Sequence, residues 1–294
     1  MLFAAMALLW GVPYLFIKET VETFSPFAMV AGRTLAGALL LLPFALRRRA
    51  LRPALARWPW VLAFGAVEMG GPFLLLGHAE QTLPSGTTGL LVATVPLVAT
   101  VIAIMRGDRT VLKPLRVIGL VIGFGGVAVI VGGPGMVAGV DGLIAVGEVL
   151  LVAVCYATAP FIVAAKLSDV PSLGSITLAL TAVGLFYLPF ALLVPSEAPT
   201  LRSGLSLLGL AVLCTAIAFI LFFALIDEVG PARAPLFTYV NPVIAIVLGV
   251  VLLGEHLSTG LLLGVPLVIV GCWLAATGGR FRAARADAEA SAIA

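Results

Sequence analysis

Three ionisable residues lie inside long apolar stretches of the sequence: Arg33, Glu68 and Glu148. Placing a charge at the centre of a membrane helix costs about 2.5–3.5 kcal/mol, so each of these residues is a candidate for function. Arg33 can hold a substrate carboxylate, because the planar guanidinium matches that group with two parallel hydrogen bonds. A structural pair between Arg33 and a carboxylate explains the same residues equally well, because buried polar groups also hold helices together.

Glu68 is the candidate for carrying a proton. It falls near the middle of its apolar stretch and shares a helical face with Gly65 and Pro72. A stripe of small residues suits a cavity wall or a close helix contact better than it suits lipid. Glu148 has a less regular stripe and falls nearer the end of its stretch. We expect Glu68 to take up and release protons, with helix packing as the alternative role for both carboxylates.

Aromatic and polar residues in other apolar stretches are candidates for the wall of a substrate cavity. They are Trp10, Tyr14, Thr94, Tyr156, Tyr239 and Asn241. Interior packing explains the aromatic members as well as a cavity does. Four prolines in these stretches are hinge candidates: Pro13, Pro96, Pro160 and Pro242. Proline leaves a backbone carbonyl without its helical partner, so it marks a hinge, a ligand contact or a tolerated kink.

The composition indicates which elements must position these residues. Of the 294 residues, 62% are hydrophobic and 11% are charged, and the mean hydropathy is +1.20. Soluble domains carry about 25% charged residues, whereas a helix crosses the hydrocarbon core in about 20 apolar residues. We therefore predict an all-α integral membrane bundle of ten transmembrane helices. The chain outside these spans is too short to form a soluble catalytic domain. The third span is expected from Trp58 to Gly77 and the ninth span from Pro235 to Leu253.

Basic residues are distributed unevenly between the two sides of this predicted bundle. With a cytoplasmic N-terminus, 14 of the 17 Lys and Arg residues fall in inner loops or the tail, while Lys18 and Arg202 fall outside. An excess of basic residues is typical of cytoplasmic loops. We expect a multi-pass protein of the inner or plasma membrane, embedded in the lipid bilayer, with both termini cytoplasmic.

The second half of the chain is a diverged copy of the first. The segment LPFAL at 42–46 recurs at 188–192, an offset of 146 residues, and Pro96 recurs as Pro242 at the same offset. The predicted parts are a first repeat at 1–133, a second repeat at 142–277 and a cytoplasmic tail at 278–294. Because each repeat contains five spans, an odd number, the second repeat must enter the membrane inverted.

The loops agree with this inversion. The loop that contains Arg106 and Arg116 is basic, whereas its counterpart around Glu255 contains no Lys or Arg. Inverted repeats are the usual architecture of alternating-access transporters. Duplication for stability alone is the alternative explanation. The pattern therefore predicts a secondary transporter with a small-molecule substrate, and protons are the candidate coupling ion.

Two segments resemble the drug/metabolite transporter superfamily, specifically its EamA-type members. The segment from Trp10 to Lys18 is similar to the Trp-Gly motif of the family's first span, and the segment from Asn241 to Glu255 is similar to its ninth-span signature. Arg33 also stands where such proteins often have an arginine. The resemblance implies a ten-helix bundle that commonly exports amino acids or related metabolites. It also implies a central cavity lined mainly by the first, third, fourth, sixth, eighth and ninth spans.

The sequence lacks the residue patterns that metal binding, ATP hydrolysis and nucleophilic catalysis require. The sequence has no metal-spaced His or Cys cluster, no Walker loop and no nucleophile elbow, so we expect no metal, no cofactor, no catalytic residues and no enzymatic activity. The basic run at 47–49 suits topology or anionic lipid, and nucleic-acid binding is rejected. A passive channel or facilitator is the first alternative function, and an intramembrane enzyme is the second.

The glycines of the expected fifth span predict a close helix contact. Gly119 and Gly123 follow the small-xxx-small pattern, which lets two helix backbones approach each other in a membrane. Packing within one monomer is the favoured use of this face, and a homodimer is the alternative.

Overall fold

The computed structural model describes residues 1–108, 112–133, 139–229, 237–238 and 240–278. All of the elements in these ranges are helical, and no strand occurs among them, which confirms the all-α prediction. Nine helical stretches in the described ranges are long and apolar enough to cross a membrane, and Asn241–Leu253 is a shorter apolar helix. The count of ten spans stays a prediction, because the expected start of the ninth span, Pro235, lies outside the described residues. So does the predicted tail after Gly278.

The chain forms two compact units, Met1–Val92 with Val137–Leu257, and Ala93–Met136 with Ser258–Ala294. The elements of the first unit are α1 (Leu2–Gly11), α2 (Pro13–Thr20), α3 (Pro26–Arg47), α4 (Leu51–Ala56), α5 (Trp58–Gly65), a first π turn (Ala66–Gly70), α6 (Gly71–Thr82), α7 (Ser85–Val92), α10 (Val140–Lys166), α11 (Ser172–Leu193), α12 (Leu201–Ala211), a second π turn (Val212–Ile217), α13 (Ala218–Val229) and α14 (Asn241–Leu253). The second unit contains α8 (Val95–Met105), α9 (Pro114–Gly132) and α15 (Thr259–Thr277).

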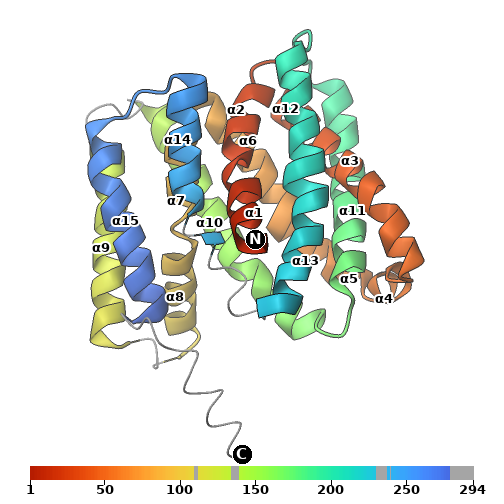
Figure 1. The fold of residues 1–294 in the computed structure, drawn as a ribbon, viewed down its shortest axis with the longest axis horizontal. Coiled ribbons are helices and arrows are strands. Elements are labelled where there is room, and N and C mark those ends of the chain that lie inside the picture. The colour runs from red at the N-terminus through yellow and green to blue at the C-terminus, as the bar shows by residue number, and fades with distance from the viewer. Residues whose placement is uncertain (109–111, 134–138, 230–236, 239, 279–294) are drawn as a thin grey trace, which may run out of the picture. The chain divides into compact units, whose positions relative to one another are not determined.

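Helices of the first unit pack in pairs that join the two halves of the chain. Helix α3 packs along α11, and α6 along α10 (Figure 1). Helix α2 packs against α12, α1 against α13, and α7 against α14. Local signals start several of these helices: Ser25 Oγ accepts the amide of Ala28 at 3.3 Å ahead of α3, and Thr200 with Ser203 forms a capping box at α12.

Two π turns interrupt the helices of the first unit. Their first residues, Ala66 and Val212, are 146 positions apart, which equals the offset of the sequence match. In the first turn, the hydroxyl of Tyr187 donates to the carbonyl of Gly70 at 3.2 Å. In the second, Thr215 Oγ1 donates to the carbonyl five residues earlier at 2.8 Å. Because a π turn widens the helix and frees backbone groups, such turns frequently mark functional sites.

The second unit depends on a glycine contact between α9 and α15, which lie side by side (Figure 1). A Cβ atom added to Gly119 would lie 2.5 Å from the amide nitrogen of Ala275 and 2.8 Å from the carbonyl oxygen of Gly271. The Gly119 and Gly123 face therefore packs against another helix of the same chain, as the sequence favoured.

Replacing Gly119 with leucine separates these two helices. We expect Gly119→Leu to lower the free energy of unfolding by about 1–3 kcal/mol, because the new side chain meets backbone that cannot move aside. Gly125→Leu on the same helix is the matched control, since a Cβ there has no atom within 4 Å. Thermal unfolding of the purified protein in detergent measures both variants, and equal midpoints would contradict this packing.

Candidate functional site

Four of the predicted site residues come together in the first unit. They are Tyr14 of α2, Arg33 of α3, Glu68 of the first π turn and Tyr156 of α10. Tyr156 lies near enough to Glu68, Tyr14 and Arg33 to interact electrostatically with each of them. We call these four residues the central cluster. It places one cation, one carboxyl and two phenols inside an apolar unit.

Arg33 is buried, with 5% of its surface exposed. Its Nε donates to Thr215 Oγ1 in the second π turn at 3.1 Å, and its guanidinium carbon lies 3.8 Å from the centre of the Phe73 ring. Stacking on an aromatic ring stabilises a desolvated cation. Within the described ranges Arg33 makes no ion pair, so the alternative of a structural pair with a carboxylate does not form there. The contacts hold the guanidinium plane in place and leave its terminal amino groups for a ligand.

The two predicted carboxylates occupy different surroundings. Glu68 is half-buried on the first π turn, and its carboxyl has no hydrogen-bond partner among the described residues. Glu148 instead pairs with Nδ1 of His78 at 2.9 Å, and the His78 side chain is 57% exposed. Glu148 therefore belongs to a pair at the surface of the unit, whereas Glu68 belongs to the central cluster.

The remaining cavity candidates lie elsewhere. Trp10 packs among the rings of Phe219, Phe222 and Phe237, with centroids 5.0–5.9 Å away, so it contributes to an apolar core. Asn241 begins α14 and is buried, and its Oδ1 atom has no partner in the described part of the chain. Thr94 is buried in the second unit, and Tyr239 lies outside the described residues.

The four prolines divide into two groups. Pro13, Pro96 and Pro242 stand in the first turn of α2, α8 and α14, where the missing amide proton has no helical partner to lose. At Pro13 the first span is divided into α1 and α2. Helix α10 continues without a break through Pro160.

A second polar group lies where α2 and α6 end and α7 begins. Lys18 donates from Nζ to the backbone carbonyls of Glu80 at 2.6 Å and Leu83 at 3.1 Å. Nearby, Glu255 accepts the amides of Ser85 at 2.7 Å and Gly86 at 3.2 Å, so its carboxylate caps the N-terminus of α7. We call this group the polar junction.

The polar junction was not predicted from the sequence, because Glu80 fell outside the expected third span. The third span was expected to end at Gly77, which put Glu80 in a loop. That boundary is wrong, since α6 continues to Thr82 and buries Glu80 completely. The sequence does contain a signal beside Glu255, because a glycine precedes it and glycine commonly ends a helix. In the structure, Gly254 ends α14 in the left-handed conformation (φ +66°).

Removing the Glu255 carboxylate leaves the start of α7 uncapped. We expect Glu255→Ala to lower the free energy of unfolding by about 1–3 kcal/mol, because the amides that it accepts lose a charged partner. Glu255→Gln keeps one acceptor oxygen, so the decrease in its free energy of unfolding should be smaller. Glu197→Ala, at an exposed carboxylate, is the control. A thermal midpoint for Glu255→Ala that matches this control would show that the cap contributes no stability.

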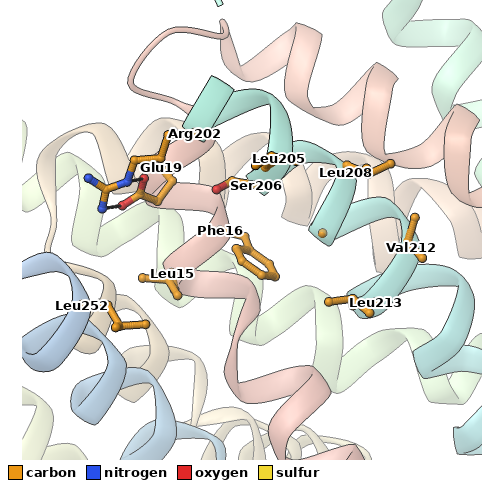
Figure 2. A pocket seen from close by; sticks show the side chains of 11 residues that line it. Leu15, Phe16, Glu19, Arg202, Leu205, Ser206, Leu208, Val212, Leu213 and Leu252 are labelled. Carbon is orange, nitrogen blue, oxygen red and sulfur yellow. Dashed lines mark hydrogen bonds and ion pairs between the residues drawn. The ribbon is translucent and has the colours of Figure 1, made fainter. Parts of the chain in front are cut away.

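An apolar groove of about 640 Å³ lies in the first unit between α2 and α12 (Figure 2). Leu15, Phe16, Leu205 and Leu208 are among its lining residues, and Glu19 and Arg202 form an ion pair at its edge. None of the predicted site residues lines this groove. Its surface suits an acyl chain more than a polar metabolite.

Ionisable residues between membrane helices are typical of membrane transporters, among other membrane proteins. Comparison with known proteins agrees. The model of the EamA-like transporter family matches residues 1–132 and 143–277. The chain therefore belongs to the EamA-like transporter family, and it is a multi-pass membrane protein.

Relatives and a solved structure are similar over nearly the whole chain. The uncharacterized inner membrane transporter YedA of Escherichia coli (strain K12) is 27% identical over 258 residues, 86% of this chain and 82% of that protein. The uncharacterized transporter YvbV of Bacillus subtilis (strain 168) is 30% identical over 285 residues, 94% of this chain and 91% of that protein. One crystal structure, at 22% identity, has a TM-score of 0.66 and covers 93% of this chain and 95% of its own. This last likeness concerns the fold alone.

Proposed function

We propose that this transporter is a secondary carrier that exports a small metabolite, an amino acid or a related compound, by alternating access. The observation that carries the proposal is the central cluster. Four different elements contribute to it, so a relative movement of the helices changes the distances between its members. Alternating access needs such a site between helices that move against each other.

Arg33 is the proposed anchor for the substrate. Thr215 and Phe73 hold its guanidinium on two sides, so its terminal amino groups can meet a carboxylate with both hydrogen bonds in place. Tyr14 and Tyr156 supply hydroxyl groups and aromatic surface beside it. An amino acid or a related carboxylate fits this combination of groups.

Glu68 is the proposed proton carrier. Its carboxyl is half-buried, interacts electrostatically with Tyr156 and has no fixed partner in the described part of the chain. A carboxyl without a fixed partner can exchange its proton when water reaches it from one side or the other. The gradient of protons would then drive export.

We propose the inner or plasma membrane as the location, with both termini cytoplasmic. The excess of Lys and Arg in one set of loops supports this orientation, and the relative YedA is named an inner membrane transporter. On this orientation the polar junction faces the outside.

A passive channel is the remaining alternative. Counterflow in proteoliposomes separates the two: substrate on the far side stimulates uptake through a carrier and leaves a channel unaffected. An intramembrane enzyme finds less support, because the described residues contain no cluster of three or more His, Cys, Asp and Glu that could hold a metal.

The role of Arg33 is tested by a thermal-shift screen of the purified protein against amino acids and drugs. We expect a carboxylate ligand to raise the unfolding midpoint of the wild type, and Arg33→Lys to remove most of that shift, because lysine keeps the charge but not the paired geometry. Arg52→Lys, at an exposed arginine, is the control. Equal shifts in the wild type and Arg33→Lys would contradict the anchor.

The role of Glu68 is tested by transport at several pH values. In Glu68→Gln the side chain stays neutral at every pH, so we expect transport driven by a pH gradient to fall to the level of protein-free liposomes. Counterflow of substrate should continue, since exchange needs no net proton movement. Glu22→Gln, at an exposed carboxylate, is the control. Normal transport by Glu68→Gln with unchanged pH dependence would exclude Glu68 as the carrier.

A further inference from the structure

Glu80 has an unusual position at the end of α6. Its side chain is completely buried. Neither of its carboxyl oxygens has a hydrogen-bond partner among the described residues. A buried charge without a partner is strongly unfavourable, and a buried carboxyl in this position avoids the penalty by holding a proton.

Lys18 lies beside Glu80 but is engaged with the backbone. Its ammonium group donates to the carbonyl of Glu80 at 2.6 Å and to the carbonyl of Leu83 at 3.1 Å. Lys18 belongs to α2, and Leu83 belongs to the connection between α6 and α7. The lysine therefore ties α2 to that connection, and its charge also interacts electrostatically with the Glu80 carboxyl.

Of the charged groups that interact with the Glu80 carboxyl, Lys18 is the cation and Glu255 is an acid. Helix α7 has no titratable side chain. Lys18, Glu255 and Tyr14 interact electrostatically with the Glu80 carboxyl. The other titratable groups on the elements packed against α6 are Glu19 on α2, Arg33 and Arg47 on α3, Glu68 on the first π turn, and Asp141, Glu148 (paired with His78), Cys155, Tyr156 and Lys166 on α10. Glu255 is occupied by the amides that begin α7, and it is a second acid, so it cannot neutralise Glu80.

We infer that Glu80 is a proton-binding site that controls the Lys18 contact. With a proton bound, the carboxyl is neutral and Lys18 stays on the two backbone carbonyls, as in this structure. When the proton leaves to water, the new carboxylate attracts the Lys18 ammonium away from those carbonyls. The connection between α6 and α7 is then released from α2.

The role of this site in transport rests on the proposed function, because the polar junction faces the outside only on the proposed orientation. There, loss of the Glu80 proton would loosen the outer end of the carrier, and proton uptake from the outside would close it. Proton binding by Glu80 itself does not depend on the substrate or on the direction of transport.

Infrared difference spectroscopy of the purified protein in nanodiscs tests proton binding directly. Between acid and alkaline pH, the wild type should lose a protonated-carboxyl band that is absent from Glu80→Gln and present in Glu22→Gln. Glu80→Asp keeps the acid and should show the band at a shifted position, which provides a second variant if the glutamine substitution fails to fold. A difference spectrum of Glu80→Gln that is identical to that of the wild type would overturn the assignment, whereas the band of Glu68 remains in both.

Hydrogen exchange of residues 83–86 tests the coupling to Lys18. Expressed as protection factors, which remove the intrinsic effect of pH, protection should fall in the wild type as pH rises. It should stay high at every pH in Glu80→Gln and low at every pH in Lys18→Met. Protection in Glu80→Gln that falls with pH as in the wild type would overturn the inference.

The infrared and hydrogen-exchange measurements need no substrate, so they test the proton site at Glu80 separately from the proposed carrier function. The Glu80 band with pH-dependent protection, in a protein that shows no counterflow, would support the proton site and refute the carrier. Counterflow in a protein without that band would support the carrier and refute the proton site.

Discussion

Hydrocarbon offers no hydrogen-bond partner, and this constraint accounts for the positions of Arg33, Lys18 and Glu255. Arg33 is tolerated because Thr215 accepts from it and Phe73 covers it. Lys18 is placed on two backbone carbonyls at the end of α6, and Glu255 on the amides that begin α7. Lys18 and Glu255 thus lie where helices end or begin, since backbone groups there are free to pair with them, and Arg33 pairs with a side chain of a widened turn.

The two π turns supply such places within the helices. The first contains Glu68, and the second contains Thr215, the partner of Arg33. Their spacing of 146 residues equals the offset between the similar halves of the sequence. The first half thus contributes Tyr14, Arg33 and the widened turn with Glu68 to the central cluster, and the second half contributes Tyr156 and, in its own widened turn, the partner of Arg33.

Helix α2 joins the central cluster to the polar junction. Tyr14 lies in its first turn and Lys18 follows one turn later, while Tyr14 interacts electrostatically with both Arg33 and Glu80. Val12 connects α2 to α1 in a right-handed helical conformation, and the two helices together form one apolar stretch, Leu2–Thr20. A movement of α2 therefore changes the surroundings of Arg33 and of Glu80 together.

The sequence by itself determined the helical membrane fold, because apolar runs of membrane length allow no other structure in lipid. It also singled out Tyr14, Arg33, Glu68 and Tyr156, since charges and hydroxyls stand out against an apolar background. Only the tertiary structure decided which of the candidates meet: Trp10 joined an aromatic core, and Glu148 joined His78. It also revealed Glu80, because burial and the loss of partners are produced by helices distant in sequence, and no local pattern records them.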